Sequence, residues 1–306
     1  MRTGTSYSKT MSTMMWFMAL LLVVFTAGCD RDHGGAIGGG GGGGGGTPGT
    51  PIVDLGLAAP FGTFGGSAGM TNTGIQTVIN GDIGTIATAT SAITGFHDTH
   101  GDIYTETPAN IGEVNTTILT CTNSTTGPNA GGPNAANCTA ATLARLDAEA
   151  AYISLAAMPG GIDVATLGGG AGELGNRTLA PGVYKSAPGT YGITLGDLTL
   201  DAQGDPNASW VFQMATSLTV GIAGPTGARS VILINGAQAK NVFWQVGSAA
   251  TINGAGGGTM VGTIISQAGV TFSTVGNTTI TTLNGRALSL VASVTMTDTV
   301  INVPAP

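Results

Sequence analysis

Short apolar segments, separated by turns rich in Gly, Asn and Asp, dominate the C-terminal half of this 306-residue chain. Each segment is too short for a stable helix, and this alternation with turn residues is typical of β-strands. Most are followed within a few residues by a small residue, one variable residue and a threonine. The apolar segments are residues 210–214, 231–234, 242–246, 260–265 and 288–291, and the segments that end on threonine are residues 191–194, 216–219, 248–251, 268–271 and 292–295.

The threonines that end these segments recur at an imperfect period. From Thr194 onward the gaps between them are 25, 32, 20 and 24 residues. A period of roughly 20–30 residues, carried by short strands with Gly-rich corners, indicates a β-solenoid in which each repeat forms one coil. Stacked coils would then bring Thr194, Thr219, Thr251, Thr271 and Thr295 into one column.

One α-helix is predicted, over residues 139–158. Thr139 is a suitable N-cap, and a Pro-Gly-Gly sequence at 159–161 ends the helix. Apolar residues at spacings of three and four define one face, which we expect to pack on a side of the solenoid. A partner helix is the alternative occupant of that face. The face consists of Leu143, Leu146, Ala150, Ile153 and Ala157.

Residues 1–28 have the pattern of an export signal. Arg2 and Lys9 precede an apolar run at 14–25, which is shorter than the about 20 residues needed to span a bilayer. The run ends in Thr-Ala-Gly-Cys29, which resembles a bacterial lipobox, although a threonine stands where leucine is usual. We predict an exported lipoprotein anchored at the cell envelope through Cys29; if cleavage is by an ordinary signal peptidase, the protein is secreted.

A flexible tether is predicted between this anchor and the folded domain. Residues 29–52 include nine consecutive glycines at 38–46, a composition that forms no packed core. A glycine-rich loop binds phosphate only between a strand and a helix N-terminus, and neither flank of this segment qualifies. The folded domain is therefore expected to span residues 53–306.

Six motifs occur in a fixed order along the strand-rich half of the chain. They are LAPGVY (179–184), LTLDAQGDPN (198–207), VILINGAQ (231–238), NVFWQVG (241–247), GTII (262–265) and LNGRAL (283–288). In this order they resemble the bacterial and fungal ice-binding β-solenoid family. The resemblance implies a mostly β fold: a right-handed parallel β-helix of triangular section with one long α-helix alongside. It also implies adsorption to ice without catalysis, and packing of first coils at 61–96 against the C-terminal ones.

Residues 97–138 interrupt this resemblance with a segment rich in Thr, Asn, Pro and Gly. Some family members carry a small capping subdomain here, and a cap would cover the unpaired strand edges at the end of a solenoid. Cys121 and Cys138 bracket part of the segment. An exported protein whose third cysteine carries lipid most simply pairs the remaining two. A disulfide closing a loop of this size would contribute about 3 kcal/mol on the chain-entropy model.

Composition and local motifs argue against several kinds of function. Charged residues make up 8% of the chain, which lacks the clustered Lys and Arg that nucleic acids require. The sequence His97-Asp-Thr-His-Gly-Asp102 holds possible metal ligands without a complete set, and Asp197, Asp201 and Asp205 lie in turn-forming sequence. We therefore predict no metal site and no cofactor. Residues 176–303 contain no His or Glu, which disfavours a β-helix polysaccharide lyase.

A threonine-rich face is the most pointed functional feature of the sequence. Strands about 4.8 Å apart, with alternate residues about 6.6–6.8 Å apart, would array threonines at spacings close to those of an ice plane. A register slip of one residue would turn every side chain to the opposite surface. A surface adhesin, a carbohydrate-binding module and a purely structural lipoprotein are the alternatives, and a monomer is expected. The predicted ice-binding residues are Thr71, Thr73, Thr194, Thr216, Thr219, Ser248, Thr251, Thr271 and Thr295.

Overall fold

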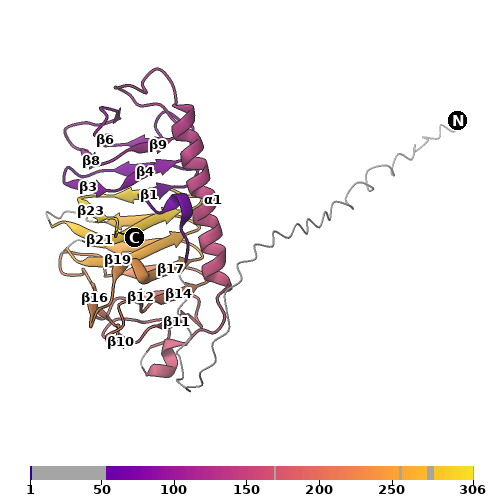
Figure 1. Ribbon diagram of the computed structural model, residues 1–306, viewed down its shortest axis with the longest axis vertical. Helices are drawn as coiled ribbons and strands as arrows, with labels where there is room; N and C mark the ends of the chain where they lie inside the picture. The colour runs from indigo at the N-terminus through magenta and orange to yellow at the C-terminus, as the bar shows by residue number, and fades with distance from the viewer. Residues whose placement is uncertain (2–52, 169, 255–256, 274–278, 306) are drawn as a thin grey trace, which may run out of the picture. The chain divides into compact units, whose positions relative to one another are not determined.

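Strands of two to nine residues stack in parallel around three sides, and their alternating inward and outward residues build a solenoid (Figure 1). The structure is a computed structural model that describes Met1 and residues 53–168, 170–254, 257–273 and 279–305. The predicted signal peptide, Cys29 and the tether lie outside the folded residues so described. The parallel β-helix predicted from the sequence is confirmed, and we number its sides 1, 2 and 3 in the order in which the chain visits them.

Side 1 comprises a three-stranded sheet and part of a thirteen-stranded one. Its strands are β10 (Thr178–Leu179), β13 (Leu198–Asp201), β16 (Val231–Ile234), the first halves of β19 (Thr259–Ser266) and β21 (Thr281–Ser289), β23 (Thr299–Asn302), β3 (Thr77–Asn80), β8 (Gly112–Val114) and β6 (Phe96–Asp98), with β7 (Ile103–Tyr104) antiparallel to β6.

Side 2 continues the thirteen-stranded sheet, and side 3 is a separate seven-stranded sheet. Side 2 contains β11 (Gly182–Lys185), β14 (Trp210–Met214), β17 (Val242–Val246), the second halves of β19 and β21, β1 (Phe61–Gly65), β4 (Asp82–Thr85) and β9 (Ile118–Thr120). Side 3 contains β12 (Tyr191–Ile193), β15 (Leu218–Val220), β18 (Ala250–Asn253), β20 (Val270–Ser273), β22 (Val294–Met296), β2 (Met70–Asn72) and β5 (Ile93–Thr94).

Two long strands turn the corner between sides 1 and 2 without a break. Gly262 in β19 and Gly285 in β21 are paired at this corner, and Gly262 has a φ of +96°. A Cβ added to Gly285 would lie 1.9 Å from the Gly262 carbonyl oxygen. Only glycine fits both positions, because one needs a left-handed backbone and the other needs the empty space.

One coil is assembled from both ends of the folded domain. β23, near the C-terminus, occupies side 1 of this coil, whereas β1 and β2, near the N-terminus, occupy sides 2 and 3. Arg286 joins the two ends: its Nε donates to the Ala59 carbonyl (2.7 Å) and its Nη2 to the Pro304 carbonyl (3.4 Å). The expected packing of N-terminal coils against C-terminal ones is therefore present.

The solenoid interior is filled by apolar side chains stacked from coil to coil. Tyr184, Phe212 and Trp244 are in register on successive strands, and the Phe212 and Trp244 rings stack at 4.1 Å between centroids. A second apolar cluster lies between side 2 and the helix. Three short 3-10 helices lie at Gly56–Ala58 (η1), Val164–Leu167 (η2) and Ala239–Asn241 (η3).

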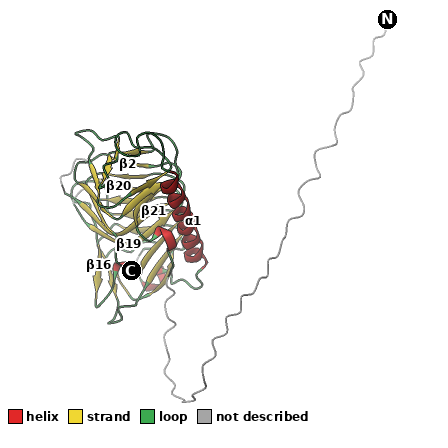
Figure 2. Ribbon diagram, turned by 45° about the horizontal axis from the view of Figure 1, so that its top comes forward, coloured by secondary structure: helices red, strands yellow, loops and turns green. Residues whose placement is uncertain are grey.

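The helix α1 (Ala135–Ala157) lies along side 2 and begins four residues earlier than predicted (Figures 1 and 2). Its N-cap is Asn134, whose Oδ1 accepts hydrogen bonds from the N–H groups of Ala136 (2.9 Å) and Asn137 (3.2 Å). The predicted cap, Thr139, instead donates its hydroxyl to the Ala135 carbonyl within the first turn. No helix in the described part of the chain has the length and apolar character needed to span a membrane.

The predicted packing face of α1 was wrong. Leu143, Leu146 and Ile153 are 43%, 53% and 59% exposed, while small residues on the opposite face are buried against side 2. The reason is space: four alanines let the helix backbone approach the flat sheet closely, and Leu155, near the C-terminal end, is the only leucine of α1 that is buried there. The buried face consists of Ala141, Ala144, Ala148, Ala151 and Leu155.

Candidate ice-binding face

The middle residue of each side 3 strand points outward between two inward neighbours. In β20, for example, Val270 and Phe272 are buried in the solenoid, while Thr271 between them is exposed. Backbone pairing aligns these middle residues from strand to strand across the sheet. They are Gly192, Thr219, Thr251, Thr271, Thr295, Thr71 and Thr94, in spatial order. We call the six consecutive threonines of this series the threonine column.

The residues beneath the column hold it in place. The inward side chains on both flanks are buried and apolar in most strands, so a slip of one residue would bury the threonines. The exception is Asn72, whose amide nitrogen donates to the carbonyls of Gly74 (2.9 Å) and Gly95 (3.1 Å). Its Oδ1 accepts the Thr77 hydroxyl at 2.8 Å. This buried polar group is thus fully used, and the strand beneath Thr71 remains regular.

Thr194 does not belong to the column, contrary to the sequence prediction. β12 pairs with β15 so that Gly192, not Thr194, lies beside Thr219. The prediction was shifted by two residues, a shift that keeps the alternation of inward and outward positions. Tyr191 and Ile193 are the buried residues of this strand, and their pairing with Leu218 and Val220 sets the true register.

Glu173 marks the end of the column beyond Gly192, with which it forms a parallel bridge. Its carboxylate accepts hydrogen bonds from the Thr194 hydroxyl (2.7 Å) and from the N–H groups of Gly175 (2.7 Å), Thr194 (2.9 Å) and Leu195 (3.3 Å). Burial by itself would raise the pKa of Glu173, but these hydrogen bonds outweigh it and leave the pKa below its ordinary value. The charged group caps the edge strand of side 3 and bounds the uncharged surface.

Three other predicted residues lie at the margins of side 3. Thr216 and Ser248 occupy the corner before the strands, where the Ser248 N–H donates to the Thr216 carbonyl at 2.7 Å. Thr73 lies two residues beyond Thr71 and hydrogen-bonds through its hydroxyl to that of Thr297. These residues flank the column and do not extend it.

Two threonines of this surface were missed by the sequence analysis: Thr94, which belongs to the column, and Thr297, which hydrogen-bonds to Thr73 beside it. Thr94 is the last threonine of the column, beside Thr71. The signal for it was present, since Ala92-Ile-Thr94 repeats the pattern of a small residue, a variable residue and threonine. Thr94 follows Thr71 by 23 residues, a gap within the range of the repeat. It was missed because the N-terminal coils were placed by their resemblance to the family and the threonine repeat was not extended to them.

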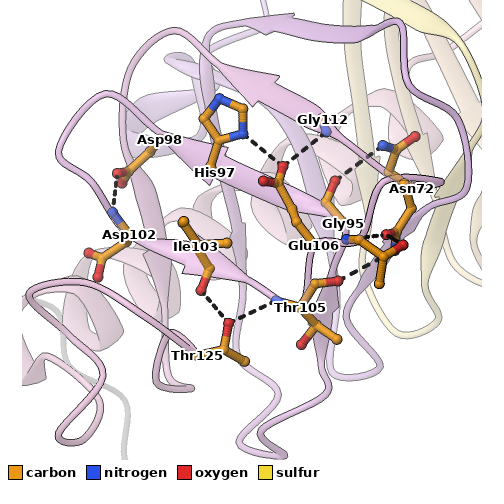
Figure 3. A network of polar contacts seen from close by, with 12 residues as sticks. Asn72, Gly95, His97, Asp98, Asp102, Ile103, Thr105, Glu106, Gly112 and Thr125 are labelled. Carbon is orange, nitrogen blue, oxygen red and sulfur yellow. Dashed lines mark hydrogen bonds and ion pairs between the residues drawn. The ribbon is translucent and has the colours of Figure 1, made fainter.

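Residues 97–138, the predicted cap, are in part a further coil, since β8 pairs with β3 on side 1 and β9 pairs with β4 on side 2. Figure 3 shows polar contacts in this segment. The residues of the possible metal motif are engaged within it. His97 Nδ1 lies 2.7 Å from Glu106 Oε1, which also accepts the Gly112 N–H. Asp98 Oδ1 accepts the N–H groups of His100 and Asp102, so this sequence organises a turn.

The disulfide predicted between Cys121 and Cys138 is present, and it ties the chain after β9 to the first turn of α1. Two of the three aspartates at 197–205, Asp201 and Asp205, serve in local turns, as their sequence context predicts. Asp201 Oδ1 accepts the Gln203 N–H and Asp205 Oδ1 accepts the Asn207 N–H, each at 2.8 Å. Asp197 Oδ1 instead accepts the N–H of Ser230, 33 residues further along the chain, at the same distance.

Known proteins are similar to this chain in sequence and in fold. The model of the family described as ice-binding-like matches residues 64–302. The chain belongs to this ice-binding-like family. Its members are known as ice-binding proteins and not as enzymes, which agrees with the function class predicted from the sequence.

Family relatives come from both bacteria and fungi. The chain is 36% identical to an ice-binding protein of Nostoc sp. over 79% of its length and 71% of the relative's. It is 33% identical to one from the yeast Leucosporidium, over 83% and 85% of the two chains. Among solved structures, the ice-binding protein of Antarctomyces psychrotrophicus superposes with a TM-score of 0.61 at 30% identity, covering 84% of this chain and 100% of the other.

Proposed function

We propose that this protein binds ice through side 3, with the threonine column at the centre of the contact. The observation that carries the proposal is the run of six in-register threonines on consecutive strands. Membership of a family whose relatives are ice-binding proteins supports it independently.

The geometry explains how such a surface recognises a solid made of water. Parallel strands set the hydroxyl and methyl groups of neighbouring threonines about 4.8 Å apart along the column. The rigid solenoid fixes these groups when it folds, so little ordering remains to be done on adsorption. A charged group would hold water in a competing arrangement, and the carboxylate of Glu173 stands at the edge of the sheet instead of within the column.

A carbohydrate-binding surface is less well supported. Such a site would be expected to expose aromatic rings, and Tyr191 was the one aromatic candidate near the predicted face. Its side chain is buried in the solenoid at 1% exposure, where it packs edge-on against Phe212.

The site of action follows from the predicted anchor. With Cys29 acylated, residues 29–52 form a tether of 24 residues, whose root-mean-square reach is about 25–30 Å. The protein then acts as a monomer at the cell envelope, where it attaches cells to ice or protects the nearby membrane, and does not condition the surrounding medium.

The test replaces column residues by tyrosine in the lipid-free Cys29→Ser protein. Thr251→Tyr and Thr271→Tyr place a ring on a flat outward surface, so thermal hysteresis should fall several-fold in each. The melting temperature should move by no more than about 1–2 °C, as for surface substitutions. Thr199→Tyr is the matched control, because Thr199 is the outward residue of β13 on side 1, with neighbours on both sides.

Three results are informative. Loss of hysteresis in both column variants and its retention in Thr199→Tyr supports the proposal. Unchanged hysteresis in the column variants, or an equal loss in the control, contradicts it. Failure of the column variants to fold contradicts the outward orientation of the threonines.

A further inference from the structure

The outer surface of α1 carries an apolar stripe that the solenoid does not use. About two and a half helical turns separate Leu146 from Leu155, so the two side chains point in opposite directions. Leu155 is buried against side 2, whereas Leu146 and the residues aligned with it are exposed. We call this surface the outer stripe; it consists of Leu143, Leu146, Ala150 and Ile153. Figure 2 shows α1 on the outside of the stacked strands.

The chain from the tether joins the folded domain beside this stripe. Val53 and Leu55 are buried in the cluster between side 2 and α1, and Val53 lies in a shallow groove with Ser154 and Met158. Leu57 then donates its N–H to Asp147 Oδ2 at 2.7 Å, and its own side chain is 53% exposed. The anchored segment therefore starts from the helix-bearing side of the domain, and Leu57 adds a fourth large aliphatic group there.

We propose that the outer stripe rests on the surface of the lipid bilayer to which Cys29 anchors the protein. This inference rests on the lipid anchor in the proposed function, and it adds a defined orientation to it. A tether with a reach of about 25–30 Å, similar to the length of α1 at about 1.5 Å per residue, keeps the stripe close to the bilayer at all times. A contact too weak to bind free protein is populated under such tethering.

The size of the stripe favours this occupant over a second copy of the chain. Half-exposed aliphatic side chains on one helix offer a few hundred Å², below the about 800 Å² per partner of a standard protein interface. A tethered surface contact needs no such area. An interfacial helix meets a bilayer through an apolar face of this kind.

The charges around the stripe indicate the kind of lipid. Arg145 is paired with Glu149 at 2.6 Å, and the carboxylate of Asp147 is bound to η1. Apart from this paired arginine the helix has no basic residue, so it lacks the cluster of free positive charges that attracts anionic lipid. We therefore expect docking on zwitterionic lipid with little dependence on salt. Docking through side 2 leaves side 3, with the threonine column, directed away from the bilayer.

The native tryptophans make a fluorescence test possible. Trp210 and Trp244 are fully buried in the solenoid, and Trp16 lies in the predicted signal peptide. In the mature protein, a quencher in the lipid should therefore reduce the fluorescence of a tryptophan introduced on the surface and not that of the buried native tryptophans. Ala150→Trp reports on the stripe, Leu146→Trp is a second reporter there, and Ile232→Trp on side 1 is the control.

The lipidated full-length mature protein is reconstituted in phosphatidylcholine vesicles with brominated acyl chains. Flotation first shows that the protein is membrane-bound, with Cys29→Ser as the unanchored control. Among floated proteins, A150W and L146W should be quenched several-fold more than I232W. Adding Leu143→Gln and Ile153→Gln to A150W should reduce its quenching to the I232W level. Adding Leu167→Gln and Ile222→Gln, which alter equally exposed aliphatic residues elsewhere, should leave it unchanged.

Each other result overturns the proposal. Protein that carries no lipid and does not float removes the anchor, and the docking with it, without affecting the ice-binding test on soluble protein. Floated protein with both reporters unquenched overturns the docking alone. Quenching that falls as protein density in the vesicle rises would indicate that a second copy covers the stripe. Shielding of the reporters from acrylamide in lipid-free protein would indicate that the chain's own tether does so.

Discussion

The two faces of α1 allow the same substitution to be made in opposite environments. Leu155→Ala removes a side chain with no exposure, packed between the helix and side 2. Leu146→Ala removes the same atoms from a half-exposed position on the outer stripe. Because alanine is the better helix former by only a few tenths of a kcal/mol, helix propensity changes little and equally in both.

The magnitudes expected from burial differ widely. A leucine buried as fully as Leu155 costs about 2–5 kcal/mol when cut to alanine, since a cavity is left as well as lost transfer energy. An exposed substitution such as Leu146→Ala lies within about 0.5 kcal/mol of neutral. For a domain of this size about 2–4 °C of melting temperature corresponds to each kcal/mol, which gives a fall of about 4–20 °C for Leu155→Ala and no more than about 2 °C for Leu146→Ala.

Thermal denaturation of the lipid-free Cys29→Ser protein, followed by circular dichroism, measures both variants. A third variant, Ala148→Leu, adds bulk at the helix–sheet contact and should cost about 1–3 kcal/mol through overpacking. The reasoning is refuted if Leu146→Ala is the more destabilising leucine variant, or if Ala148→Leu is tolerated. Either result would mean that the helix packs through the larger residues after all.

Two further predictions concern the ends of the solenoid. Because the pKa of Glu173 is lower in the folded protein than its ordinary value of 4.5, the carboxylate stabilises the fold above that pH, and this stabilisation is lost as pH falls through the folded pKa. In urea unfolding, Glu173→Gln should therefore be less stable than wild type at pH 7 and should converge with it at acid pH. A difference in stability that stays constant with pH would count against this role of Glu173. Replacing Cys121 and Cys138 by serine removes their disulfide and should lower the free energy of unfolding by about 3 kcal/mol. Thermal hysteresis should stay nearly unchanged, because the bond lies beside α1 and not on side 3; a large loss of hysteresis would link the cap to ice binding.

The sequence pattern was sufficient for the solenoid but not for the register of every coil. Thr219, Thr251, Thr271 and Thr295 were aligned correctly, because each stands two residues after a small residue in a repeat of similar form. Thr194 was misplaced, since a shift of two residues preserves the alternation and only the pairing of buried residues distinguishes the two registers. Hydrophobicity alone cannot make that distinction.

The helix shows a different limit. Residues 135–157 contain two apolar stripes, one of alanines and one with leucine and isoleucine, and the larger side chains have the stronger hydrophobic signal. Which stripe is buried depends on the gap between α1 and side 2, a property of the assembled sheet and not of the helix sequence. The start of the helix was missed for a local reason, because both Asn134 and Thr139 are acceptable N-caps.

The coil shared by the two ends of the domain has a consequence for the order of events in folding. Thr71 and Thr295 are neighbours in the column, yet 223 residues of chain lie between them. Contacts of such high sequence separation form late and slowly, because closing the long loop costs conformational entropy before the contacts can contribute any stabilisation. Until β2 reaches β22, the C-terminal strands carry four threonines of the column and the N-terminal strands two. The complete threonine column, the proposed ice-binding surface, therefore arises at one of the last steps of folding, and affinity for ice should report that the two ends of the domain have met.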